Sequence, residues 1–275
     1  MMRTGCQTYA WQMSLPTYQG RIDHIASVVG RAGFAGLEPE VIMLGDFASA
    51  ERLRGALEPN HLALAALTLV EDWADEHESP RERAAADAAI ALTRSFDGAL
   101  LALCQMPGPD RHDLRERQQR LLSCVADIAA RAEDAGVGTT FHPNSPAGSL
   151  FRARQDYEIL LDGLPARVGF TPDLGHVARG GMDALEVVRQ YRERVNHVHA
   201  KDMDSHGQWA LIGTGVVPVA EVAEFLYRTG YQGWFVLEDE SELARRDPDA
   251  VAAQLGNYVE QVLGPRYSAP PPPPV

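Results

Sequence analysis

The stretch Val195-Asn196-His197-Val198-His199 predicts a short β-strand that ends in a potential metal ligand. Three other strand-like runs end in the same way: Val137–Phe141 before His142, Val168–Thr171 before Asp173, and Trp234–Leu237 before Glu238. The four ligand-type residues are 31, 26 and 39 positions apart, about one strand-helix unit each. A (β/α)8 barrel gathers the carboxyl ends of its strands on one face, where active sites lie. We therefore expect the four side chains to meet there and hold a divalent ion such as Mn²⁺, Zn²⁺, Co²⁺ or Mg²⁺.

The rest of the chain alternates short apolar runs with long amphipathic stretches, which is typical of a parallel sheet with crossover helices. We predict one (β/α)8 TIM barrel of the α/β class over residues 1–264, because such a barrel needs about 250 residues. The expected strands are 4–8, 35–38, 62–69, 99–104, 137–142, 168–171, 195–199 and 234–237. The expected helices are 21–32, 80–95, 114–135, 155–161, 182–191, 219–228 and 249–263. Residues 265–275 are rich in proline, and we expect a disordered tail there.

Composition restricts the partners and the compartment. A formal net charge of −13 argues against a nucleic-acid partner, because phosphate binding needs clustered Lys and Arg. No run approaches the roughly 18 apolar residues of a membrane span, so no membrane partner is expected. The three cysteines, Cys6, Cys104 and Cys124, are far apart and odd in number, which favours a reducing cytoplasm over a disulfide framework. We also expect no signal peptide.

Two of the four strand ends carry a second polar side chain. His197 and His199 point the same way because side chains alternate along a strand. His199 is nearer the mouth and is the better ligand, so His197 is expected one layer deeper. Asp173 precedes Gly175 and His176, and one interpretation places Asp173 on the metal and His176 on a substrate hydroxyl. Asp173 could instead cap the next helix.

The other two strand ends suggest catalytic groups. Glu238 directly follows its strand and could act both as a ligand and as a base. Asp239 and Glu240 come next, and we interpret them as a solvated acidic cluster. His142 could bind metal or act as a base beside it, and Asn144 shares its face.

Further candidates lie near the ends of other strands. Glu38 closes the second expected strand and could bind substrate hydroxyls or act as an acid or base, and Glu40 points the same way. Three side chains could form a wall against a sugar ring, although ordinary packing explains each of them too: Gln7, Trp11 and Trp209. Gly213-Thr214-Gly215 lacks the spacing of a dinucleotide fingerprint, so no nucleotide cofactor is expected.

Four motifs give the chain a family resemblance. They are Gly33-Phe34-Ala35-Gly36-Leu37-Glu38, Asp173-Leu174-Gly175-His176, His197-Val198-His199-Ala200-Lys201-Asp202, and Gly230-Tyr231-Gln232-Gly233-Trp234 through Glu238. They match the patterns GFxGhE, DxxH, HxHxKD and GYxGxhxhE. Over residues 3–263 the chain resembles the xylose-isomerase-like TIM-barrel family, also called sugar phosphate isomerases/epimerases or AP-endonuclease family 2.

The resemblance implies a metal held by His142, Asp173, His199 and Glu238. In ketose 3-epimerase members the first position is a glutamate that exchanges a proton with the substrate together with the last one. Here that position is His142, and Phe141-His142-Pro143-Asn144 is closer to the YHxH form of inosose dehydratases. This departure weakens the two-glutamate mechanism.

The resulting hypothesis is a metal-dependent isomerase or epimerase that acts on a keto sugar or keto cyclitol through an enediolate. Glu238 would move the α-proton, assisted by His142 and His176. The substrate-binding residues would be Glu38, His176, Lys201, Asn144 and Trp11. The alternatives are a dehydratase of the inosose or 3-dehydroshikimate type, which uses the same enolate, and a non-catalytic sugar-binding barrel. We expect a small polyol or keto-sugar substrate, preferably unphosphorylated. Because barrels of the family that the chain resembles often pair, the chain could also form a homodimer.

Overall fold

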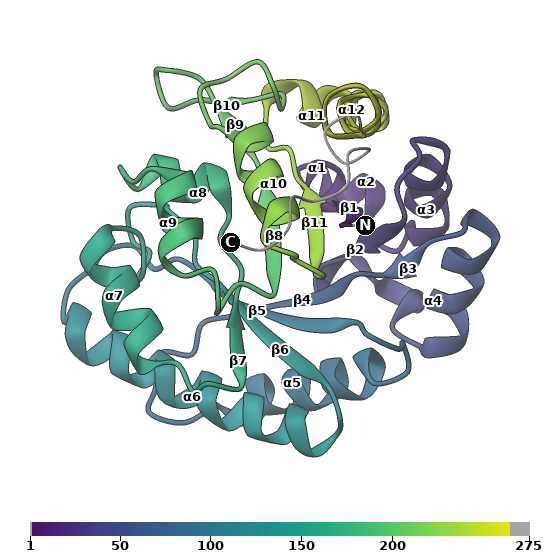
Figure 1. Ribbon diagram of the computed structural model, residues 1–275. Helices are drawn as coiled ribbons and strands as arrows, with labels where there is room; N and C mark the ends of the chain where they lie inside the picture. Colours follow the sequence, from purple (N-terminus) through teal and green to yellow (C-terminus); the bar gives the residue numbers. More distant parts are fainter. Residues whose placement is uncertain (1, 265–275) are drawn as a thin grey trace.

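The computed structural model describes residues 2–264. Parallel strands form the centre of the fold, and helices surround them (Figure 1). The barrel strands are β1 (Arg3–Gln7), β2 (Gly36–Glu38), β3 (Ala63–Leu64) with β4 (Ala66–Glu71), β5 (Leu100–Gln105), β6 (Gly138–His142), β7 (Val168–Phe170), β8 (His197–Ala200) and β11 (Trp234–Leu237). The predicted Pro-rich tail, residues 265–275, lies outside the described residues.

The strands close into a barrel through two sheets. One has the order β3-β2-β1-β11-β8 and the other β4-β5-β6-β7, and every neighbouring pair in them is parallel. Parallel bridges join their edges, Glu40 to Thr68 on one side and Phe170 to Val195 and Asp173 to His199 on the other. The predicted (β/α)8 barrel is confirmed, and all strand ends open on one face.

Helices cover the outside of the barrel. The longer ones are α3 (Ile22–Arg31), α4 (Ala50–Leu57), α5 (Pro80–Thr93), α6 (Leu114–Asp134), α7 (Arg154–Gly163), α8 (Leu174–Arg179), α9 (Ala184–Gln190), α10 (Val219–Arg228) and α12 (Pro248–Tyr258) with the π-helical η4 (Val259–Leu263). Short ones are α1 (Tyr9–Gln12), α2 (Leu15–Tyr18), α11 (Glu242–Arg246), and the 3-10 helices η1 (Val41–Met43), η2 (Gly45–Phe47) and η3 (Glu58–Asn60). Among these residues, no helix combines the length and the apolar composition that crossing a membrane requires.

Local signals explain where the predicted helices begin and end. Ser79 and Glu82 form a capping box at the start of α5, with Pro80 in its first turn. Gly33, Gly136 and Gly230 follow α3, α6 and α10 with φ of 84°, 76° and 70°, values that glycine adopts without strain.

Several elements lie outside the prediction. Helix α4 follows the Ser49 cap, where no helix was expected. The expected helix over 182–191 is α9, and the separate α8 directly follows Asp173. Strands β9 (Asp202–Met203) and β10 (Trp209–Ala210) form an antiparallel hairpin after β8. The two-residue strands and the one- or two-turn helices are too short to produce a clear hydrophobic period.

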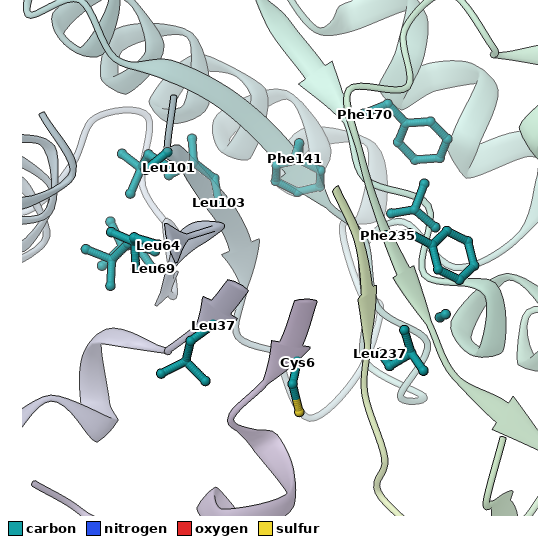
Figure 2. Packing of buried hydrophobic residues seen from close by; sticks show 14 of the residues in the cluster. Cys6, Leu37, Leu64, Leu69, Leu101, Leu103, Phe141, Phe170, Phe235 and Leu237 are labelled. Carbon is teal, nitrogen blue, oxygen red and sulfur yellow. The ribbon is translucent and has the colours of Figure 1, made fainter. Parts of the chain in front are cut away.

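Alternate residues of β11 belong to two different apolar clusters. Phe235 and Leu237 join the large core between strands and helices, which Figure 2 shows together with Phe141 and Phe170. Each buried side chain of this size contributes about 1.5–3 kcal/mol. The intervening Trp234 and Val236 form a small cluster with Ala65 instead. The interior of the barrel below the mouth is therefore packed, with Trp234 as its largest side chain.

Gly36 makes room for Trp234. A Cβ atom at position 36 would lie 2.6 Å from the Cη2 and Cζ3 atoms of that indole and 3.3 Å from the Ala63 carbonyl oxygen. We expect Gly36→Ala to lower the free energy of unfolding by about 1–3 kcal/mol, because the rigid ring must shift. Urea denaturation measures this change. Gly55→Ala is the control, since a Cβ on that exposed residue of α4 meets nothing within 4 Å. Equal effects of the two substitutions would contradict the packing argument.

Candidate functional site

Four ligand-type side chains from four strand ends meet at the mouth of the barrel. His142 ends β6, Asp173 follows β7, His199 lies in β8 and Glu238 follows β11. One ligand atom from each lies within 4.8 Å of the others, and all four residues are buried. His142 Nε2 is 3.6 Å from Asp173 Oδ2, and His199 Nδ1 is 3.0 Å from Glu238 Oε2. The structure therefore brings together the four residues that the spacing of the strands singled out.

Three of these side chains turn an atom without a hydrogen bond toward this common point. His142 Nε2, Asp173 Oδ2 and His199 Nδ1 are buried and accept or donate no hydrogen bond among the described residues. Their charged neighbours are close: Asp173 Oδ2 lies 3.3 Å from the Lys201 ammonium, and His199 Nδ1 lies 3.0 Å from Glu238 Oε2. Two of these side chains form a hydrogen bond through their other polar atom. Asp173 Oδ1 accepts from the His176 backbone N–H at 2.7 Å, and His199 Nε2 lies 2.8 Å from Glu38 Oε1. Buried polar atoms are rarely left without a partner. Imidazole nitrogens and carboxylate oxygens suit Zn²⁺, Mn²⁺ or Co²⁺, so the residues fit a divalent ion.

Glu38 lies beneath this group and not in the cavity, which corrects its predicted role in binding substrate. It is fully buried, and its carboxylate contacts His197 Nε2 at 2.6 Å, His199 Nε2 at 2.8 Å and the Thr68 hydroxyl at 2.7 Å. His197 lies one layer deeper than His199, as the strand alternation predicts. Glu38, His197 and His199 also offer grouped ligand atoms, but those contacts already occupy the Glu38 oxygens. Glu38 therefore orients the imidazole of His199.

Burial and neighbouring charges have opposite effects on the pKa values of Glu38 and His199. Burial alone would raise the pKa of Glu38, but His199 and His197 hold that pKa well below its usual range. Burial would lower the pKa of His199, yet the carboxylates of Glu38 and Glu238 raise it to about 10. The imidazole of His199 is thus protonated without metal, and an incoming ion must displace that proton.

Lys201 lies beside the ligand group and is the only lysine in the sequence. It is 1% exposed, and its ammonium lies 3.3 Å from Asp173 Oδ2 and 2.7 Å from Glu238 Oε1 and also contacts Glu240 Oε1. Burial disfavours the charge, but these carboxylates raise the pKa of Lys201 well above its usual value. Despite its own burial, the pKa of Glu238 is lowered to about 2, chiefly by Lys201.

The interpretation of Asp239 and Glu240 as a solvated cluster is wrong. Asp239 is 1% exposed and accepts from the Ser241 N–H at 2.8 Å. The Glu240 side chain is 15% exposed and contacts Lys201. Both acids are buried because the chain after β11 folds back into α11 and does not extend into solvent.

His176 is a neutral imidazole held between two elements. Burial and the nearby Lys201 lower the pKa of His176 to about 3. Its Nε2 lies 3.3 Å from the Lys201 ammonium, which can only donate, so Nε2 accepts. Its Nδ1–H then donates to the Ser145 hydroxyl at 2.7 Å. Trp209, from the β9–β10 hairpin, packs edge-on against this ring at 5.2 Å.

A cavity of about 160 Å³ opens above these residues. The predicted site residues His142, His176, His199, Glu238 and Asn144 line it, as does Gln7. Its other lining residues are Tyr9, Gln12, Glu40, Thr68, Val70, Cys104, Met106, Pro107, Pro146 and Glu240. The amide nitrogen of Asn144 donates to the Gln105 carbonyl at 2.8 Å, and its amide oxygen accepts from the Ser149 hydroxyl, so both polar ends of that side chain are already engaged.

Trp11 does not reach the cavity, which corrects its predicted place beside the substrate. It is fully buried, and its indole N–H donates to Asp249 in α12 at 2.7 Å. Its position within the short α1 turns the ring toward the helical layer.

Glu40 lines the cavity in the place expected for Glu38. Gln12 donates to its carboxylate at 2.8 Å, and burial raises the pKa of Glu40 to about 7. The sequence did contain a signal for this residue, because Glu40 follows Glu38 by two positions and so lies nearer the mouth. No comparable signal marked Gln12, Tyr9 or Ser145.

Lys201 can be tested by removing its charge. We expect Lys201→Met to lower the free energy of unfolding of the metal-free protein by about 3–5 kcal/mol, because buried carboxylates lose their counter-charge. Urea denaturation in the presence of a chelator measures this loss. The control is Arg52→Met at an exposed ion pair with Asp46, with an expected change under about 1 kcal/mol. Similar losses for both variants would show that Lys201 does not compensate these charges.

Part of the chain is similar in sequence to a named enzyme. An inosose dehydratase of Lacticaseibacillus casei is 23% identical over 176 residues, which cover 58% of this chain and 59% of that protein. The match thus spans less than two thirds of the relative's length.

Solved structures share the fold over nearly the whole chain. A D-psicose 3-epimerase with D-tagatose from Clostridium cellulolyticum H10 has a TM-score of 0.71 and 16% identity, with 95% of this chain and 99% of that chain covered. A protein named IOLI, with a zinc atom bound, has a TM-score of 0.74 and 13% identity, with 98% and 100% covered. At these identities the likeness shows the fold alone.

A sequence profile of the xylose isomerase-like TIM barrel matches residues 27–259, which is most of the chain. The four motifs that carry the resemblance lie within that span. This chain therefore belongs to the xylose isomerase-like TIM barrel family.

Proposed function

We propose that this chain is a divalent-metal-dependent isomerase or epimerase that acts on a keto sugar or keto cyclitol through an enediolate. One observation carries the proposal: unbonded atoms of three buried side chains from three strands point at a common position beside Glu238. A cavity of about 160 Å³ with many polar groups adjoins that position. Family membership and the relatives named as enzymes of cyclitols and sugars support it.

His142, Asp173, His199 and Glu238 would hold the ion. A bound divalent cation supplies Lewis-acid stabilisation of the negative charge that develops on a substrate oxygen. Two of these ligands are fixed by hydrogen bonds on the side away from the ion. Glu38 binds Nε2 of His199, and the backbone N–H of His176 donates to Oδ1 of Asp173. Such outer contacts fix the orientation of a ligand before the ion arrives.

Other residues would move protons and hold hydroxyls. Glu238, ionised because its pKa is about 2, would take the α-proton from substrate carbon and return it. Lys201 would keep that carboxylate in place; it does not line the cavity, which corrects its predicted role in binding substrate. His176 is neutral and lines the cavity, so it can accept or relay a hydroxyl proton.

A dehydratase is the second candidate. It shares proton removal by Glu238 but then expels a β-hydroxyl, with His142 as the acid. His142, in place of the glutamate expected in ketose 3-epimerases, favours this reaction, as does the named activity of the Lacticaseibacillus casei relative. We also propose a cytoplasmic location, in keeping with three free, buried cysteines.

Metal binding can be measured directly. We expect one Mn²⁺ or Zn²⁺ per chain by calorimetry and elemental analysis, and at least about a hundredfold weaker binding in His199→Ala, because a ligand is lost. Glu38→Gln should weaken binding about 10–100-fold, because it only orients that ligand. His206→Ala, on an exposed turn after β9, is the control and should bind as wild type does. Full metal occupancy in His199→Ala would remove this residue from the ligand set.

Turnover distinguishes the two reactions. The metal-loaded protein is incubated in D₂O with ketoses, an inosose and 3-dehydroshikimate. An isomerase or epimerase introduces solvent deuterium at carbon without loss of mass as water, whereas a dehydratase releases water and forms an enone.

The base is tested in the same assay. We expect Glu238→Gln to lower turnover by more than about a hundredfold while the circular dichroism spectrum is retained. Glu242→Gln, on the exposed start of α11, should leave turnover unchanged. Turnover of Glu238→Gln within about tenfold of wild type would contradict its role as base.

A further inference from the structure

The cavity offers an anionic substrate no free cation. None of the described residues that line it is an arginine or a lysine, although the sequence has 25 of these residues. Lys201 is buried under the cavity floor and is already shared among Asp173, Glu238 and Glu240. Away from the proposed metal ion, a phosphate or carboxylate group on a ligand would therefore lose its hydration without gaining a charged partner.

When its carboxylates are ionised, the charges around the cavity sum to a negative value. Five carboxylates line it or lie directly beneath it: Glu38, Glu40, Asp173, Glu238 and Glu240. Lys201 and a bound divalent ion together contribute three positive charges, fewer than the five negative ones. Like charges at these distances repel strongly inside a protein, where the effective dielectric constant is far below that of water.

Part of the cavity lining is apolar. It consists of Val70, Met106, Pro107 and Pro146, and Met106 is half exposed. A charged substituent in contact with these side chains would find no polar partner. The apolar part of the lining thus cannot pair with an anion.

The side walls suit hydroxyl groups instead. Glu40 accepts from the Gln12 amide at 2.8 Å, and the Gln12 carbonyl oxygen is buried without a partner among the described residues. This pair presents acceptors to the cavity, and neutral His176 also lines it. A volume of about 160 Å³ corresponds to roughly five waters, enough for one small ring.

We infer that the substrate of this site is an uncharged polyol, and that Glu40 and Glu240 select against phosphorylated sugars and carboxylate-bearing cyclitols. This inference rests on the proposed function for the location of the site, and it excludes acids such as 3-dehydroshikimate from the substrates of the dehydratase alternative. It assigns Glu40 a contact with substrate hydroxyls, where the sequence favoured Glu38.

Matched pairs of ligands that differ in charge test the inference. Binding to the Mn²⁺-loaded protein is measured by calorimetry at pH 8 for quinamide against quinate, and for D-fructose against D-fructose 6-phosphate. We expect the uncharged member of each pair to bind at least about tenfold more tightly. Equal or tighter binding of the anionic member, or no binding of either uncharged ligand, would overturn the inference.

Variants connect the selectivity to the two carboxylates. Glu40→Gln and Glu240→Gln keep the shape of each side chain but remove its charge. Each should therefore lower the ratio of the affinity for the uncharged ligand to that for the anionic ligand by at least about threefold. Glu51→Gln, on the exposed start of α4, removes the same charge far from the cavity and should leave the ratio as in wild type. Unchanged ratios in both cavity variants would show that these residues do not select.

The outcome remains separate from that of the proposed reaction. The selectivity is an affinity ratio and needs no turnover. A ratio that favours the uncharged ligands, together with an absence of deuterium exchange and of water release, would contradict the isomerase and the dehydratase while leaving the selectivity intact.

Discussion

Charge compensation by Lys201 is the interaction on which the mouth of the barrel depends. Asp173, Glu238 and Glu240 are brought out of water by the closure of the strands, and an isolated buried carboxylate would take up a proton instead of remaining ionised. One ammonium lies within 3.3 Å of the first two and contacts the third. Asp173 and Glu238 can therefore stay ionised, the form that the proposed metal binding and proton abstraction would need.

The barrel places this charged group on successive layers of different chemistry. Trp234 fills the bottom, with Gly36 leaving the space for its ring. Glu38 and His197 form the polar layer above it, and the ligand group lies above that layer. Each layer fixes the next, because the strands are too closely packed for a side chain to change its height without moving its neighbours.

Much of this arrangement follows from the sequence. Strand ends at His142, Asp173, His199 and Glu238 could be recognised because short runs, turn residues and the glycines after helices agree with one another. The positions of Glu38 and Trp11 could not. Strand alternation gives the face of a side chain but not its height in the barrel, which depends on how far neighbouring strands are staggered.

The other features that the sequence did not predict also depend on tertiary contacts. Glu240 was expected in solvent because acidic loop residues usually are, and only the return of the chain into α11 buries it beside Lys201. The β9–β10 hairpin, which brings Trp209 against His176, is too short to be predicted from any period. Such residues can be assigned only when the segments that surround them are placed.

A consequence for amine chemistry follows from Lys201 being the single lysine. Apart from an α-amino group, acylating and reductively alkylating reagents find no primary amine on this chain other than one shielded by three carboxylates. Acylation, glycation or isopeptide attachment at position 201 therefore requires that the mouth of the barrel has opened. The other basic side chains of Lys and Arg type are all arginines, whose guanidinium groups do not react with acylating or reductively alkylating reagents.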